Sequence, residues 1–310
     1  MYLTTQSLKR GCVAGLVLAV GLALGACGRS ASGDPLTPTA AKGSVVVGSA
    51  NFPEDELLAQ IYATALAAKG VKVTDQFSIG AREVYYPEIE KGAITIIPEY
   101  NGALLTTEVD PSSTAVTAAS VDAQLKAGLP ASLRILNPSS AQDKDSVTVT
   151  QAFATRHHLS SIAQLKPLAE SMIFGAPPEF KTRADGEAGL RQRYGLVFKG
   201  FDALDESGPI TLKALLDGKV QAADVFTTTP QILTDHLVSL ADPESDFAAQ
   251  NVLPLVYRKG VDATVVNTLN AISARLTTAG LLEMDKAIIV DHANYSTVAT
   301  AWLKAEGLPS

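Results

Sequence analysis

Cysteine is almost absent from this chain of 310 residues. Its only two cysteines, Cys12 and Cys27, leave no later thiol for a disulfide, a zinc cluster or a cysteine nucleophile. Long apolar runs are equally scarce. The uncharged stretch from Val13 to Leu24 has 12 residues, whereas a helix that crosses a bilayer needs about 20. The sequence therefore predicts no membrane span.

Basic charge is also in deficit. Lys and Arg total 25 against 32 for Asp and Glu, which gives a net charge of −7. If a leader containing Lys9 and Arg10 is removed, the net charge becomes 23 − 32 = −9. Such an acidic body argues against nucleic acid as a partner.

The motifs of common hydrolases and nucleotide-binding enzymes are missing. The sequence has no Gly-x-Ser-x-Gly, no His-Glu-x-x-His and no Gly-x-x-x-x-Gly-Lys. His157 and His158 are neighbours whose side chains point apart, and no His or Cys stands at ligand spacing from them. We expect no metal, no cofactor and no enzyme activity. An exported hydrolase with a Ser-His-Asp arrangement is the alternative from another class.

The N-terminus has the order of a secretory signal. Lys9 and Arg10 precede the apolar run, and Leu24-Gly25-Ala26-Cys27 resembles the bacterial lipobox. We expect residues 1–26 to be a signal peptide, Cys27 to carry a lipid and residues 27–43, rich in Gly, Ser, Pro and Thr, to form a flexible tether. This predicts an exported protein anchored at the outer face of the cytoplasmic membrane. A chance cysteine near an ordinary cleavage site is the alternative.

The remaining body has an α/β pattern. Val45 to Val47 predicts a strand, Pro53 and three acidic residues begin a helix of roughly 15 residues, and a second strand follows Gly70. The apolar segment 93–97 predicts a further strand, followed by a polar aromatic loop over 98–102. About 265 residues exceed what one hydrophobic core usually spans, so we expect two lobes.

A repeat supports two similar lobes. Gly48 and Gly175 are offset by 127 residues, Gly92 and Gly218 by 126, and an aromatic residue stands eight positions after each member of the second pair. In parallel α/β sheets ligands bind beyond the carboxyl ends of strands. Two lobes that face each other through such loops form a cleft for a small solute.

From about Ser44 to Leu308 the chain resembles the substrate-binding proteins of quaternary-amine and osmoprotectant ABC importers, of the glycine betaine, choline and carnitine type. The stretches PEYNG and EFKTRADG carry the resemblance most specifically. It implies a type II periplasmic-binding-protein fold with two α/β lobes, a ligand cleft and two hinge crossovers. The implied divisions are 44–146 for the first part of lobe 1, 147–252 for lobe 2 and 253–310 for the return of lobe 1.

The resemblance also implies a cage of aromatic rings around a quaternary ammonium group. Tyr100 and Phe226 stand at two ring positions, and Arg183 stands at the position that binds an anion. Ala50, Leu212 and Val147 replace a lysine and two tyrosines of the family, which argues against glycine betaine itself and favours a solute with an extended polar or aromatic body. The predicted ligand-binding residues are Asn51, Phe52, Glu99, Tyr100, Asp145, Arg183, Phe226, Thr227 and Thr228.

Each of these residues has a plainer interpretation. Phe52, Tyr100 and Phe226 suit a hydrophobic core, Asp145 suits a strand cap, and Glu99 suits a group that holds its own loop. Arg183 suits a surface salt bridge, for which Asp185 and Glu187 are the nearest candidates. The sequence leaves these alternatives open.

The expected mechanism is closure of the two lobes on a small solute. The closed protein then delivers the solute to a membrane permease, and a partner ATPase supplies the energy for transport. We expect a monomer held to the membrane by its lipid. A sensor or surface lipoprotein of the same fold, without a role in transport, is the alternative function.

Overall fold

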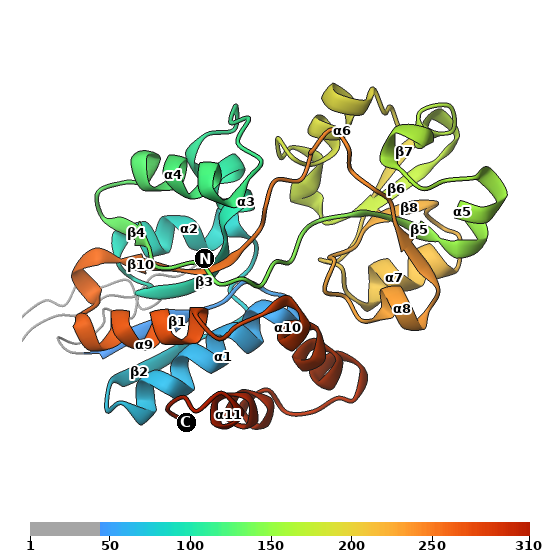
Figure 1. Cartoon of the computed structure of the whole chain (residues 1–310). Helices are drawn as coiled ribbons and strands as arrows, with labels where there is room; N and C mark the ends of the chain where they lie inside the picture. Colours follow the sequence, from blue (N-terminus) through green and yellow to red (C-terminus); the bar gives the residue numbers. More distant parts are fainter. Residues whose placement is uncertain (1–43) are drawn as a thin grey trace, which may run out of the picture. The chain divides into compact units, whose positions relative to one another are not determined.

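The computed structural model describes residues 44–310 (Figure 1). The predicted signal peptide, Cys27 and the tether lie outside the described residues. Within the described part no helix is long and apolar enough to cross a membrane.

The first lobe is built on a five-stranded mixed sheet. Strand β1 pairs in parallel with β2 and β3, and β10 runs antiparallel between β3 and β4. Its strands, in spatial order, are β2 (Lys72–Gln76), β1 (Ser44–Gly48), β3 (Ile96–Tyr100), β10 (Val252–Tyr257) and β4 (Leu133–Ile135). Its helices are α1 (Pro53–Ala68), α2 (Arg82–Lys91), α3 (Asn101–Leu104), α4 (Ala118–Gly128), α9 (Ala263–Ser273), α10 (Thr278–Asp285) and α11 (Tyr295–Ala305).

The second lobe repeats this plan. Strand β6 pairs in parallel with β7 and β8, while β5 runs antiparallel to β8 and β9. Its strands, in spatial order, are β7 (Gly200–Ala203), β6 (Ile173–Ala176), β8 (Ala222–Asp224), β5 (Val147–Thr150) and β9 (Leu237–Ser239). Its helices are α5 (Gln151–His157), α6 (Glu187–Tyr194), α7 (Pro209–Leu216) and α8 (Gln231–Thr234).

The chain passes between the sheets twice. The first sheet takes strands from residues 44–135 and 252–257, and the second takes strands from residues 147–239. The colours of Figure 1 show the consequence, because the first lobe combines blue and green segments with the orange and red C-terminal ones. We call residues 136–146 and 240–251 the two crossing segments.

Helix α1 forms as its sequence predicts. Pro53 occupies the first turn, where its missing N–H costs no hydrogen bond, and three acidic residues lie at the positive end of the helix dipole. Leu57, Leu58 and Ile61 are fully buried in the core of the first lobe, and the helix packs along α11. Each such side chain stabilises the fold by about 2 kcal/mol. The packing fixes the N-terminus of α1 at the carboxyl end of β1.

The repeated glycines have the same roles in both lobes. A Cβ on Gly48 would lie 3.0 Å from the Ile79 side chain, and one on Gly175 would lie 2.7 Å from the Leu204 side chain. At both positions a neighbouring side chain thus occupies the space that a larger residue would need. Gly92 and Gly218 follow α2 and α7 with positive φ angles of 82° and 72°, a conformation that glycine adopts without strain. The repeat in the sequence therefore reflects two similar strand–helix–strand arrangements.

The prediction of a loop over residues 98–102 is wrong. Residues 98–100 belong to β3, which is buried throughout, and α3 begins at Asn101. Proline usually interrupts a central strand because it lacks a donor. Here Pro98 lies directly opposite Pro254 of the antiparallel neighbour β10, so that two residues without an N–H face each other. Glu99 and Tyr100 are thus held by a strand rather than by a loop.

Candidate functional site

Three aromatic rings from both lobes meet at the ends of strands. Phe52 is the residue before α1, Tyr100 ends β3, and Phe226 follows β8. The ring centroid of Phe52 lies 6.0 Å from that of Tyr100 and 5.3 Å from that of Phe226. All three line a small cavity of about 40 Å³, which we call the ring cavity.

The Tyr100 hydroxyl belongs to a hydrogen-bond chain that joins the lobes. It donates to Glu54 Oε1 at 2.6 Å, and the Thr228 hydroxyl of the second lobe donates to Glu54 Oε2 at 2.6 Å. Glu54 is 4% exposed, and burial raises the pKa of its carboxyl. Thr228 thus acts on Tyr100 through Glu54 and does not line the ring cavity itself.

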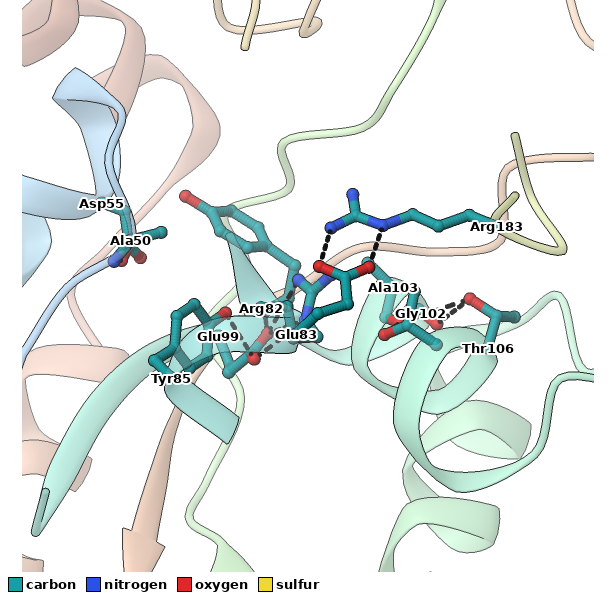
Figure 2. A network of polar contacts seen from close by, with 12 residues as sticks. Ala50, Asp55, Arg82, Glu83, Tyr85, Glu99, Gly102, Ala103, Thr106 and Arg183 are labelled. Carbon is teal, nitrogen blue, oxygen red and sulfur yellow. Dashed lines mark hydrogen bonds and ion pairs between the residues drawn. The ribbon is translucent and has the colours of Figure 1, made fainter. Parts of the chain in front are cut away.

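A buried ion pair lies behind the ring cavity (Figure 2). Arg82 Nε donates to Glu99 Oε1 at 3.0 Å, and its Nη2 donates to Oε2 at 3.0 Å. The Tyr85 hydroxyl donates to Glu99 Oε1 at 2.7 Å, and the Tyr100 backbone N–H donates to Oε2 at 3.0 Å. Glu99 is fully buried and does not line the cavity, whereas Arg82 and Tyr85 do. Glu99 therefore orients Arg82 and Tyr85.

Arg183 forms a bidentate ion pair across the lobes. Its Nε donates to Glu83 Oε1 at 3.0 Å and its Nη2 to Oε2 at 3.1 Å (Figure 2). The pairing to Asp185 or Glu187 considered from the sequence is wrong for this structure. Asp185 instead accepts a hydrogen bond of 2.6 Å from the Thr106 hydroxyl of the first lobe. The loop that carries Arg183 is thus held to the first lobe at two points.

Carboxyl groups surround the rings. Asp143, Asp145 and Glu206 all line the ring cavity. Asp145 Oδ2 accepts a hydrogen bond of 2.8 Å from Gln250, so that the two crossing segments are joined within the site. Burial raises the pKa of Asp143 well above its usual range, and the adjacent Glu54 adds to this.

The pKa of Glu206, another carboxyl of the ring cavity, is also perturbed. Burial, with a further contribution from Glu179, raises the pKa of Glu206 to about 8. Arg183 and Arg82 act in the opposite direction, yet each arginine is already paired with another glutamate. The site therefore presents carboxyl groups in excess of free basic charge.

Not all of the predicted ligand-binding residues line the ring cavity. Asn51 is exposed and lines a separate hollow with Pro177 and Glu179. Thr227 is exposed, and its hydroxyl donates to Asp143 at 3.3 Å. The ring cavity thus gathers five of the nine predicted residues: Phe52, Tyr100, Asp145, Arg183 and Phe226.

Several cavity residues escaped the sequence analysis. Arg82 and Gln250 belong to no motif, and the acidic run at the start of α1 was explained fully by the helix dipole. Glu54 contacts the cavity residue Tyr100, and its position at the carboxyl end of β1 was the one signal in the sequence for a role near the site. No group of three or more His, Cys, Asp or Glu in the described part of the chain has an arrangement that could hold a metal.

Comparison with known proteins places these features in a family. Residues 43–305 match the model of the substrate-binding domain of the ABC-type glycine betaine transport system. The chain belongs to this family. The resemblance inferred from the sequence is thereby confirmed, and the family is one of extracytoplasmic solute-binding receptors of ABC transporters.

Relatives with names and structures support the assignment. A glycine-betaine-binding protein of Pseudomonas aeruginosa is 23% identical over 273 residues, which cover 84% of this chain and 88% of the relative. A crystal structure of a glycine betaine/carnitine/choline ABC transporter protein has a TM-score of 0.65 at 16% identity, covering 85% of this chain and 99% of the other.

A lactococcal protein of the family, solved in a closed conformation with glycine betaine, has a TM-score of 0.61 at 13% identity and covers 85% of this chain and 96% of its own. At such identities these structures show the fold alone. The predicted two-lobed α/β fold of the type II periplasmic-binding-protein class is confirmed.

Proposed function

We propose that this chain is the solute receptor of an ABC importer and binds a small quaternary-amine-like solute in the ring cavity. The observation that carries the proposal is the convergence of Phe52, Tyr100 and Phe226 from two lobes beside a group of carboxyls. A cation that cannot donate strong hydrogen bonds is best held by the negative faces of aromatic rings. Burial raises the pKa of the nearby Asp143 and Glu206 carboxyls in the free chain, and a bound cation would favour their ionised form.

Lobe closure is the proposed mechanism. Side-chain contacts join the lobes, among them Glu54 with Thr228, Glu83 with Arg183, and Thr106 with Asp185. A solute that touches rings of both lobes binds the closed state better than the open one, and shifts the population by that difference in affinity. We propose the lobe divisions 44–146, 147–252 and 253–310 for this motion.

The partners follow from the family. The closed receptor would deliver its solute to a permease whose ATPase supplies the energy, and the receptor itself would catalyse no reaction. We propose that it acts as a monomer, anchored by a lipid on Cys27 at the outer face of the cytoplasmic membrane. Two acyl chains supply a stable attachment where a single chain would not.

Calorimetric titration with glycine betaine, choline, carnitine and proline betaine tests the proposal. We expect at least one of them to bind at micromolar concentration and Phe226→Ala to weaken it by about tenfold, since a desolvated cation–π contact contributes up to about 2 kcal/mol. Phe153→Ala is the matched control, because Phe153 packs on the second-lobe core away from the cavity. Absence of binding by all four, or equal losses in the two variants, would count against the proposal.

A further inference from the structure

A second and larger cavity adjoins the ring cavity. Its volume is about 530 Å³, and it shares Phe52, Glu206 and Phe226 with the ring cavity. Because the same side chains form part of both walls, a molecule held by the rings of Phe52 and Phe226 borders on both spaces.

The larger cavity has a mainly apolar wall. Apolar side chains of this wall come from α7 of the second lobe, and from the segment between α10 and α11 and the start of α11 in the first lobe. They include Leu212, Leu216, Ile288, Ile289 and Tyr295. Apolar wall of this extent favours an apolar occupant, because burial of each methylene group is favourable in water.

The polar end of the larger cavity carries carboxyl groups. Glu54 and Asp285 both line it, and Asp285 is 1% exposed. Burial raises the pKa of Asp285 well above its usual range, and the neighbouring Glu54 carboxyl raises it further. A cation that enters this end of the cavity would therefore meet two adjacent buried carboxyls and would favour their ionised form.

The basic groups of the site are already committed. Arg82 is held by Glu99 and Arg183 by Glu83, each through two nitrogens. A solute carboxylate would therefore have to displace a protein carboxylate from one of these arginines. A solute without a carboxylate meets no such obstacle.

We propose, on the basis of the proposed function, that the solute is a cation without an anionic group, whose head lies among the three rings and whose apolar extension occupies the larger cavity. The head faces the carboxyls at the junction of the two spaces. The extension contacts the apolar wall formed by α7 and the segment between α10 and α11.

Titration with matched quaternary amines tests both parts. Choline and glycine betaine share a trimethylammonium head and differ in the carboxylate, and we expect choline to bind at least tenfold more tightly. Among trimethylammonium ions with ethyl, butyl and hexyl chains we expect affinity to rise by about fourfold per methylene, the fold-change that corresponds to burial of one such group.

Two tryptophan substitutions locate the extension. Leu216 lines the larger cavity and is 47% exposed, so that Leu216→Trp can narrow the cavity without disturbing the core. We expect it to abolish the gain with chain length and to leave the affinity for tetramethylammonium within about twofold. Leu233→Trp, at a residue 73% exposed on α8 and outside the cavity, is the control and should keep the gain.

The outcomes separate this proposal from the one on which it rests. If glycine betaine binds as well as choline and chain length has no effect, the receptor function stands and the present inference fails. If no quaternary amine binds, both fail. A chain-length gain that survives Leu216→Trp would place the extension elsewhere and would overturn the assignment of the larger cavity.

Discussion

Two arginine–glutamate pairs of similar geometry border the site and differ in what they connect. Arg82 and Glu99 belong to the same lobe and are 7% and 0% exposed. Arg183 and Glu83 come from different lobes and are 16% and 45% exposed. The first pair cannot separate without unfolding its lobe, whereas separation of the lobes breaks the second. One pair positions the site, and the other depends on closure.

The largest expected effect comes from breaking the buried pair. Glu99→Gln leaves the Arg82 guanidinium buried without its countercharge, so we expect the free energy of unfolding to fall by about 3 kcal/mol. Urea unfolding followed by circular dichroism measures it. Glu88→Gln is the control, because Glu88 forms an exposed pair with Lys91 that contributes little. A loss of less than about 1 kcal/mol for Glu99→Gln would remove the contrast between the two pairs.

Arg82 and Arg183, the basic members of the two pairs, both act on the pKa of Glu206. The dependence of stability on pH therefore tests how the pairs influence this carboxyl. Its folded-state pKa of about 8 exceeds the ordinary 4.5, so the folded chain binds the proton more tightly and stability falls as pH rises between these values. From pH 6 to pH 8 we expect this group to remove about 2 kcal/mol of the free energy of unfolding.

Glu206→Gln should therefore lose that part of the pH dependence, as measured by thermal unfolding at the two pH values. Glu179, Arg183 and Arg82 are the charged groups that act on it. Glu83→Gln frees Arg183 to interact with Glu206 and should reduce the dependence in the same direction. An unchanged pH profile in Glu206→Gln would show that another group carries it.

The smallest effect is expected from the pair between the lobes. Because this pair is partly exposed, Glu83→Gln should change global stability by less than about 1 kcal/mol. It should weaken the binding of a cationic solute up to about fivefold by lowering the closed population. Small-angle scattering measures the closed population, and calorimetry measures the affinity for the solute.

The same variant leaves Arg183 without its partner. We therefore expect the affinity for glycine betaine relative to choline to rise in Glu83→Gln. A stability loss equal to that of Glu99→Gln, or an unchanged ratio between the two solutes, would mean that the pairs do not differ in the way described.

The sequence predicted what depends on local pattern. The repeated glycines and the rings that follow them mark the ends of equivalent strands, so Tyr100 and Phe226 could be paired without knowledge of the fold. Helix α1 was predictable because its proline, acidic first turn and apolar face act within a few residues.

Contacts between distant segments were not predictable in this way. Glu83 and Arg183 are 100 residues apart, and Glu54 and Thr228 are 174 apart. No spacing rule connects residues on two different sheets. The last three residues of β3 were predicted as a loop, because the effect of Pro98 is offset only by its antiparallel neighbour β10, which lies far along the chain.

The bond between Gln250 and Asp145 gives the crossing segments a further property. These two residues line the ring cavity, and their hydrogen bond joins the two crossing segments by which the chain passes between the described sheets. The proposed hinge and the proposed binding surface therefore share residues. We expect a solute beside Asp145 to stiffen the two crossing segments, so that its binding changes the rate at which the lobes open and close as well as the angle between them.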